Sequence, residues 1–130
     1  MQRKPWAAGR LTLALLAGGL AMAAQAKDVV LVMTIANYGS QPLEGVKFDG
    51  RNALEIAQRL GYDTSQATVL KDGQLTSQGL KEAIGQLSTQ VQRNDRVFVY
   101  YSGHGYSQLQ AGQCVQTLVG QDGGLVSTAE

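Results

Sequence analysis

Long apolar blocks, separated by polar turns, predict the strands of this protein. A near-continuous apolar run rich in β-branched residues covers residues 28–36, and a second covers residues 97–101. Runs without polar alternation are typical of strands that are covered on both faces of a sheet. A shorter run at residues 67–70 is closed by the Asp72-Gly73 turn. The sequence therefore predicts three core strands, with the strand at residues 97–101 in a central position.

Two segments between the strands repeat their apolar residues at helical spacing. The first runs from about residue 46 to residue 60, and Gly61 ends it. The second begins at Thr76 or Ser77, either of which can cap it, and ends before residues 92–95. The apolar stripes consist of Val46, Ala53, Ile56, Ala57 and Leu60 in the first helix, and of Leu80, Ala83, Ile84, Leu87 and Val91 in the second.

The element order β-α-β-α-β predicts an α/β fold, an α/β/α sandwich with a mostly parallel sheet and helices on both faces. After Gly105 the pattern weakens, with a candidate strand at residues 115–119 and a turn at residues 122–124 that leads into Leu125 and Val126. Three core strands make a small parallel sheet, which is usually part of something larger. We therefore expect this fold to be incomplete.

The first 26 residues have the three parts of a secretory signal peptide. Three basic residues precede residue 11, an apolar run follows, and Ala24-Gln25-Ala26 offers the small residues that a signal peptidase requires. The apolar run is shorter than the ~20 residues of a membrane-spanning helix, which favours cleavage over an uncleaved anchor. We therefore expect removal of residues 1–26. Residues 27–130 would then be exported to a periplasm or secreted, with no membrane attachment after cleavage.

Charge and cysteine content narrow the classes of partner. Removal of residues 1–26 takes away three positive charges, so the formal net charge falls from +1 (11 basic and 10 acidic residues) to −2 (8 and 10). The remaining chain has no basic stripe, and we expect no nucleic-acid partner. Cys114 is the only cysteine, so no intrachain disulfide can form. The residues by themselves assign no cofactor and no metal ion.

His104, the only histidine, stands between Gly103 and Gly105 directly after the strand at residues 97–101. In open α/β sheets, ligands and catalytic groups gather beyond the carboxyl ends of the strands. An imidazole titrates near neutral pH, and glycine on both sides lets the backbone approach a ligand closely. These features make His104 a candidate catalytic residue. An ordinary polar loop histidine is the alternative that this residue alone leaves open.

Two motifs connect this histidine to a known family. Leu43-x-Gly45-x-x-x-Asp49-x-x-x-Ala53 enters the first helix, and Asp95-x-Val97-x-Val99-Tyr100-Tyr101-Ser102-Gly103-His104-Gly105 covers the candidate site. With these motifs, residues 28–122 resemble the amino-terminal half of the caspase-like cysteine peptidase domain, in its bacterial caspase and metacaspase branch. The Tyr-Ser-Gly-His-Gly segment is the most specific part of the resemblance. For Asp49, in the first turn of its helix, we expect an interaction with the helix dipole rather than a catalytic role.

The resemblance implies a cysteine endopeptidase that cleaves a polypeptide substrate with a His–Cys dyad. His104 matches the dyad histidine, which assists the thiol and protonates the leaving amine. The backbone N–H of Gly105 would stabilise the tetrahedral oxyanion. Metacaspase relatives cleave after Arg or Lys and often depend on calcium, whereas caspases cleave after Asp. The sequence assigns neither specificity, and the single Asp122-Gly123 pair does not make a calcium site.

The chain departs from the family pattern at the nucleophile. The family cysteine lies roughly 50 residues beyond the histidine, whereas 26 residues follow His104 and Cys114 is ten positions away, without the family context. We therefore expect Cys114 to be a structural or incidental thiol, and its use as a nucleophile with His104 is the weakest hypothesis. The hypothesis that we favour is a fragment of a peptidase that is inactive alone. Its alternative is a non-catalytic caspase-like interaction or scaffold protein.

Overall fold

The computed structural model describes residues 25–127, and residues 1–24 and 128–130 lie outside the described part. The signal peptide expected at residues 1–26 therefore falls almost entirely outside the described residues. Within residues 25–127, no helix is long and apolar enough to cross a membrane.

A three-stranded parallel sheet occupies the centre of the described structure. Its strands are β1 (Asp28–Thr34), β2 (Thr68–Lys71) and β3 (Arg96–Ser102), in the order β2-β1-β3. Both β2 and β3 run parallel to β1, so the carboxyl ends of all three strands lie at the same end of the sheet. The expected parallel α/β arrangement is confirmed.

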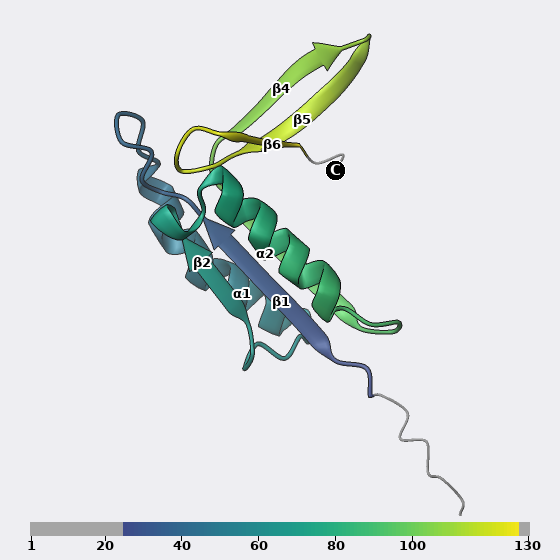
Figure 1. The fold of residues 1–130 in the computed structure, drawn as a ribbon. Coiled ribbons are helices and arrows are strands. Elements are labelled where there is room, and N and C mark those ends of the chain that lie inside the picture. The colour runs from purple at the N-terminus through teal and green to yellow at the C-terminus, as the bar shows by residue number, and fades with distance from the viewer. Residues whose placement is uncertain (1–24, 128–130) are drawn as a thin grey trace, which may run out of the picture.

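One helix covers each face of this sheet, as Figure 1 shows for α1 (Asp49–Arg59) and α2 (Ser77–Gln90). Successive residues of β1 point to opposite faces, so each helix packs on alternate positions of the same strand. The buried cluster on the α1 face is Val30, Val32, Ala53 and Ala57, and the cluster on the α2 face is Leu31, Met33, Ile35, Leu75, Leu80, Ala83 and Val126. Tyr100 packs against the first cluster and Tyr101 against the second, as expected for neighbouring strand residues.

Two short 3-10 helices lead into the longer helices. η1 (Glu44–Phe48) precedes α1, and η2 (Asp72–Gln74) follows β2. The helix predicted from about residue 46 to residue 60 is therefore divided at Asp49. The Thr76 hydroxyl caps α2 by accepting the N–H of Gly79 at 3.1 Å, which settles the choice between the two predicted caps.

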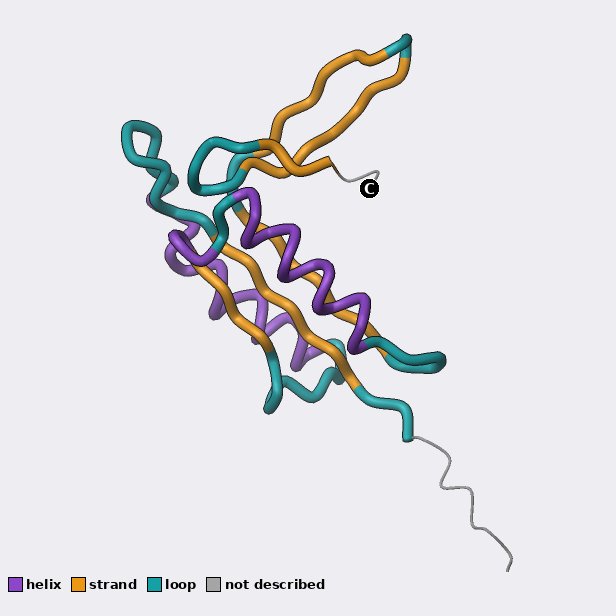
Figure 2. The backbone as a smooth tube through the Cα atoms, in the orientation of Figure 1, coloured by secondary structure: helices purple, strands orange, loops and turns teal. Residues whose placement is uncertain are grey.

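A second, antiparallel sheet follows β3 and extends away from the parallel sheet (Figure 2). It consists of β4 (Gly105–Gln110), β5 (Gln113–Val119) and β6 (Leu125–Ser127), in chain order. Ala111 and Gly112 connect β4 to β5, and both have positive φ, which is the geometry of a tight type I′ hairpin turn. The sequence analysis did not predict β4, because this strand is mostly exposed and has no buried apolar face.

Among the described residues, β3 does not hold the central position that the sequence predicts for it. The sequence places the apolar run of residues 97–101 in a central, doubly covered strand, whereas β1 is central and β3 lies at the edge of the described sheet. Val97 and Val99 are 37% and 48% exposed. An apolar composition shows that a strand can be buried between other strands and helices. It does not show which strands and helices adjoin it. Within residues 25–127, the outer edge of β3 and part of its α2-side face lie open.

The apolar stripe predicted for the first helix is also partly wrong. Ala53 and Ala57 are buried against the sheet, but Ile56 and Leu60 are 46% and 61% exposed. Leu54, which the prediction left out, packs against the buried cluster instead. The small alanine side chains let α1 approach the sheet closely, and they fix which side of the helix faces inward.

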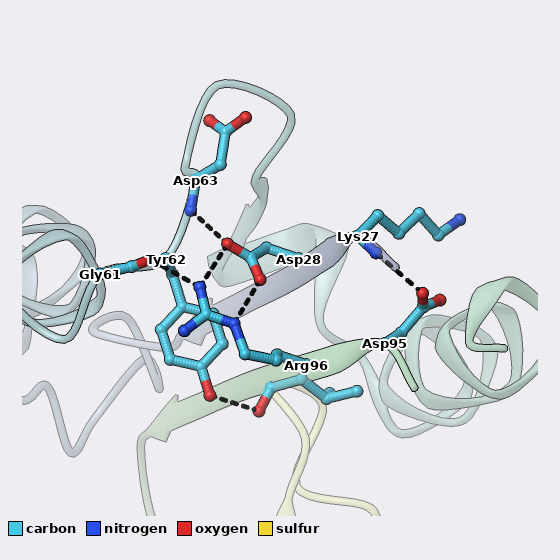
Figure 3. A network of polar contacts seen from close by, with 8 residues as sticks. Lys27, Asp28, Gly61, Tyr62, Asp63, Asp95 and Arg96 are labelled. Atoms are coloured by element: carbon cyan, nitrogen blue, oxygen red, sulfur yellow. Dashed lines mark hydrogen bonds and ion pairs between the residues drawn. The ribbon is translucent and has the colours of Figure 1, made fainter. Parts of the chain in front are cut away.

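A polar network closes the end of the sheet that lies opposite the carboxyl ends of the strands (Figure 3). Arg96 of β3 binds both carboxylate oxygens of Asp28 in β1, at 2.7 and 2.8 Å, and also reaches the carbonyl of Gly61. The backbone N–H of Asp63 donates to the same carboxylate at 2.7 Å. The guanidinium of Arg96, followed by the Asp63 N–H, holds the pKa of Asp28 below its ordinary value. This bidentate pair joins the first residues of the two strands.

Candidate active site

His104 lies at the carboxyl end of the parallel sheet, in the two-residue connection between β3 and β4. The strand ends at Ser102, and the second sheet starts at Gly105. The imidazole is therefore placed where the chain leaves one sheet and enters the other. This position fits the expectation that chemistry gathers beyond the carboxyl ends of parallel strands.

The backbone of His104 is attached to β5 through a tyrosine hydroxyl. On one side, the carbonyl of His104 accepts the N–H of Val119 at 3.0 Å. On the other side, the N–H of His104 donates to the hydroxyl of Tyr38 at 3.0 Å, and that hydroxyl donates to the carbonyl of Val119 at 2.9 Å. The Tyr38 hydroxyl thus stands between the two groups that a continuous ladder would pair directly.

Tyr101 provides a second hydroxyl beneath the same connection. Its oxygen lies 3.2 Å from the Tyr38 hydroxyl and 2.9 Å from the carbonyl oxygens of both His104 and Val119. Burial, followed by the bond with Tyr38, raises the pKa of Tyr101 well above its ordinary value. The phenol therefore stays protonated, and it stays a hydrogen-bond donor, throughout the neutral pH range.

Gly103 has a steric reason to be glycine. A Cβ atom at this position would lie 2.6 Å from the hydroxyl oxygens of both Tyr38 and Tyr101. Such a distance is far below van der Waals contact. The missing side chain is thus what allows the two tyrosine hydroxyls to reach the backbone of His104.

The imidazole of His104 is held by one backbone carbonyl and one aromatic ring. Its Nε2 lies 3.2 Å from the carbonyl oxygen of Gln41, and its ring centroid lies 4.4 Å from that of Tyr38, with the planes inclined at 51°. A carbonyl oxygen only accepts hydrogen bonds, so this contact requires a proton on Nε2. The neutral imidazole then has its lone pair on Nδ1, the nitrogen that is available to a reacting group.

The loop that carries Tyr38 and Gln41 is fixed at both ends. The Asp72 carboxylate accepts the backbone N–H groups of residues 36 and 37, each at 2.9 Å. The N–H of Leu43 donates to the carbonyl of residue 36 at 2.8 Å, which closes the loop. Asp72 itself adopts a positive φ of 45° at the end of β2. The second strand therefore helps to position the groups that contact the histidine.

Gly105 presents its backbone N–H on the side away from β5. His104 and Val119 stand at a hydrogen-bonded position of the ladder, with the Val119 N–H bonded directly to the His104 carbonyl, and Gly105 stands opposite Leu118 in the next pair. Bonded and non-bonded pairs alternate in an antiparallel ladder, so the N–H of Gly105 points outward. Gly105 is also exposed. An oxyanion that approaches this side would find an N–H donor without a side chain in front of it.

Asp49 has a contact that the sequence analysis did not foresee. Its carboxylate accepts the hydroxyl of Ser102 at 2.6 Å. Asp49 is the first residue of α1 and Ser102 is the last residue of β3, two positions before His104. The helix-dipole role expected for Asp49 suits its position in the first turn. The additional bond fastens α1 to the strand that delivers the histidine.

A cleft of about 580 Å³ opens beside the imidazole. His104 and Gly105 both line it, so the two predicted site residues lie together at one surface. The cleft is completed by Tyr38, Gln41, Tyr106, Val119, Gln121, Asp122, Gly123 and Leu125. Asp122 is the one charged side chain among these lining residues of the described chain. This hollow is large enough to receive side chains of a peptide.

Asp122 forms hydrogen bonds that join the turn before β6 to the start of α2. Its two carboxylate oxygens accept the N–H and the hydroxyl of Ser77 at the start of α2, at 2.9 and 3.0 Å. Within residues 25–127, no group of three or more His, Cys, Asp or Glu side chains is placed to hold a metal ion. Calcium takes six to eight oxygen ligands, which include backbone carbonyls and water as well as carboxylates. Calcium dependence stays an implication of the resemblance alone.

Cys114 lies far from the imidazole. It is an exposed free thiol in β5, opposite Leu109 near the turn of the β4–β5 hairpin. Four residue steps of the ladder separate this pair from the pair of Gly105 and Leu118, a distance of about 13 Å at the usual rise per residue. A direct attack by Cys114 with help from His104 is incompatible with this arrangement.

Tyr38 and Gln41 contact His104 but were absent from the predicted site. Gln41 acts through its backbone, which carries no signature in the sequence. Tyr38 could have been found, because it is the one aromatic residue in the polar turn of residues 37–42, which follows the carboxyl end of the first strand.

A comparison with protein-family models finds a match that spans most of the chain. The family model described as caspase domain matches residues 27–130. The match begins at the first residue after the predicted cleavage point. No curated protein matches the chain.

Proposed function

This chain belongs to the caspase-domain family, and from that premise we propose that it is the histidine-bearing half of a caspase-like cysteine endopeptidase. The family suggests cysteine-peptidase chemistry on protein substrates. The observation that carries the proposal is the placement of His104. Its Nε2 is engaged by the carbonyl of Gln41, which leaves Nδ1 as the nitrogen that can accept a proton, and His104 lines the cleft.

The proposed role of His104 is proton transfer. Nδ1 would accept the proton of a cysteine thiol, and the thiolate sulfur would attack the carbonyl carbon of the scissile peptide bond. As the C–N bond breaks, the imidazolium would return its proton to the leaving amine nitrogen. Water would then hydrolyse the thioester and release the acid. The carbonyl of Gln41 would keep the proton on Nε2 throughout this sequence.

Gly105 is the proposed oxyanion donor. The ladder pattern directs its N–H away from β5, on the surface where it lines the same cleft as His104. An N–H donor that is already oriented stabilises the negative charge that develops on the carbonyl oxygen. The absence of a side chain at this position leaves room for the substrate carbonyl.

We infer that the nucleophilic cysteine comes from a continuation of the chain beyond these 130 residues. The hairpin position of Cys114 supports this inference, because that thiol is too distant to react with help from His104. The outer edge of β3 supports it as well. A further parallel strand on that edge would end beside His104 and would extend the sheet next to the exposed Val97 and Val99.

The proposed substrate preference is for a basic side chain. The lining that this chain contributes carries one carboxylate, that of Asp122, and no cationic side chain. An acidic substrate residue would meet no compensating positive charge on this wall. A basic residue would meet the negative charge of Asp122, whose pKa is held below its ordinary value by the hydrogen bonds from Ser77 and Gly124. Peptide reporters with Arg or Lys before the cleaved bond should therefore be turned over faster than reporters with Asp.

Export is part of the proposal. The sequence of residues 1–26 supports a cleaved leader, with a product that begins at Lys27 and resides in a periplasm or outside the cell. This compartment would give the peptidase access to exported or extracellular polypeptides.

The DNA that follows the Glu130 codon tests the proposed peptidase. We expect it to encode a further apolar strand that ends in a cysteine, in a Cys-x-Ser-Gly-like context. Absence of such a cysteine from every reading frame would overturn the proposal. It would favour the second candidate, a non-catalytic caspase-like interaction or scaffold protein, which the distance between Cys114 and His104 also supports.

A further inference from the structure

The Tyr38 hydroxyl occupies a position in the β4–β5 ladder that a direct backbone bond would normally fill. It accepts the N–H of His104 and donates to the carbonyl of Val119. We propose that Tyr38 and Tyr101 are positioning residues, whose paired hydroxyls hold the backbone of His104 while the Tyr38 ring sets the orientation of the imidazole. This inference deepens the proposed peptidase function and rests on it for its catalytic meaning.

The backbone part of the proposal follows from hydrogen-bond accounting. A direct bond between the N–H of His104 and the carbonyl of Val119 would draw these two groups together, whereas the inserted hydroxyl holds them apart. The His104 backbone is thereby moved toward the loop of residues 37–42. Without the Tyr38 hydroxyl, the partly buried N–H of His104 would lose its hydrogen-bond acceptor. An unpaired buried N–H is costly, so we expect the backbone at residues 103 and 104 to shift toward another acceptor.

The side-chain part follows from the two contacts of the imidazole. The ring of Tyr38 lies against one side of it, at 4.4 Å between centroids, and the carbonyl of Gln41 faces Nε2. The same residue therefore touches the backbone of His104 through its hydroxyl and the imidazole through its ring. The two contacts together restrict where Nδ1 points.

Tyr101 acts as the support of Tyr38. Its hydroxyl lies within hydrogen-bond distance of the Tyr38 hydroxyl and of the carbonyl oxygens of His104 and Val119. Burial keeps Tyr101 protonated, as its raised pKa indicates, so its hydrogen-bond role persists throughout the neutral pH range. Gly103 is the steric counterpart of this arrangement, because any Cβ there would displace both hydroxyls.

The sole histidine makes the test direct, since the imidazole resonances in the NMR spectrum of this chain come from one residue. The variant Tyr38→Phe removes the hydroxyl and keeps the ring, and Tyr38→Leu removes both. Tyr62→Phe is the matched control. It deletes a tyrosine hydroxyl that donates to the carbonyl of Val97 at 3.3 Å, near the opposite end of the sheet.

Tyr38→Phe should accelerate hydrogen exchange of the His104 amide by about tenfold, the value of one lost hydrogen bond. Tyr38→Leu should in addition shift the imidazole proton resonances, because the ring current of Tyr38 is lost. Tyr101→Phe should change the amide exchange of His104 in the same direction as Tyr38→Phe. Tyr62→Phe should leave both readouts as in the wild type.

In the complete gene product, Tyr38→Phe should lower kcat with little change in KM, because it misplaces the proton-transfer group rather than the substrate. Unchanged amide exchange and unchanged imidazole resonances in the Tyr38 and Tyr101 variants would overturn the inference. Spectra that change as expected in a gene product without peptidase activity would uphold the positioning and overturn the proposed function. The two failures are therefore distinguishable.

Discussion

The backbone N–H of His104 donates to the hydroxyl of Tyr38 at 3.0 Å, although 65 residues of chain lie between them. The two residues follow the carboxyl ends of β3 and β1, which are neighbours in the parallel sheet. Strand pairing therefore brings the turn after the first strand to the histidine after the third. The geometry of the candidate site is a direct product of the fold.

Loss of the bond between Asp49 and Ser102 should destabilise the protein. The carboxylate accepts the Ser102 hydroxyl at 2.6 Å in a partly buried position. A hydrogen bond to a charged group is worth about 2 kcal/mol, so Asp49→Ala should lower the free energy of unfolding by about that amount in chemical denaturation.

Glu44→Ala is the control for this measurement. Glu44 pairs with Lys47 on the exposed surface, and surface pairs contribute less than about 1 kcal/mol. Equal losses for Asp49→Ala and Glu44→Ala would contradict the importance assigned to the Asp49 contact.

Tyr101 should make the protein sensitive to alkaline pH. Burial and the Tyr38 bond raise its pKa in the folded state, so the unfolded chain releases the phenol proton first. The stabilisation is fully present below the unfolded pKa of about 10 and is lost as the pH rises beyond it. Thermal unfolding midpoints measured between pH 9 and 11 (about the unfolded pKa) should fall less steeply in Tyr101→Phe than in the wild type. Identical slopes would count against a desolvated Tyr101 hydroxyl.

Asp28 should make the protein sensitive to acid pH, whereas Tyr101 makes it sensitive to alkaline pH. Arg96 and the Asp63 N–H lower its pKa in the folded state, so its contribution is present above the unfolded pKa of about 3.9 and is lost as the pH falls below that value. Asp28→Asn should flatten the acid limb of a plot of midpoint against pH. Arg96→Gln should flatten it partly, because the bond from Asp63 remains. An acid limb that neither variant changes would refute this assignment.

Processing after Ala26 should create a new ion pair. The backbone nitrogen of Lys27 lies 3.0 Å from a carboxylate oxygen of Asp95 (Figure 3). Cleavage would turn this N–H into an ammonium group, and an ion pair would replace a neutral hydrogen bond. Mass spectrometry of the exported product should find Lys27 as its first residue.

The variant Asp95→Asn tests the structural part of this prediction. It should lower the unfolding midpoint of the processed chain more than that of a precursor in which cleavage is blocked. An equal effect in both forms, or a product that starts at another residue, would contradict the proposed pairing.

Pattern in the sequence was sufficient for the elements that bury apolar residues. The strand at residues 28–36 and three members of the α2 stripe, Leu80, Ala83 and Leu87, follow from spacing, because burial imposes that spacing directly. Ile84, which the same stripe included, is 39% exposed. The β4 strand was missed since its mostly exposed residues are under no such constraint. The edge position of β3 was missed since composition reports what a strand tolerates rather than what adjoins it.

The site divides along similar lines. His104 stands out in the sequence as a candidate because it lies between two glycines after an apolar run, and the resemblance adds Gly105. The roles of Tyr38 and Gln41 depend on the pairing of β1 with β3, which brings distant segments together. The bond from Ser102 to Asp49 depends on the residue at which α1 begins. Periodicity locates the end of a helix only to within about two to four residues, so it does not predict this contact.

Turnover of peptide reporters by the complete gene product tests the proposed peptidase most directly. The wild type, His104→Ala and the control Cys114→Ser are compared by kcat/KM on an Arg or Lys reporter. We expect His104→Ala to lose about 10³-fold or more, as removal of a catalytic dyad or triad member does, and Cys114→Ser to retain wild-type turnover. Turnover that survives in His104→Ala, or that disappears in Cys114→Ser, would contradict the proposal.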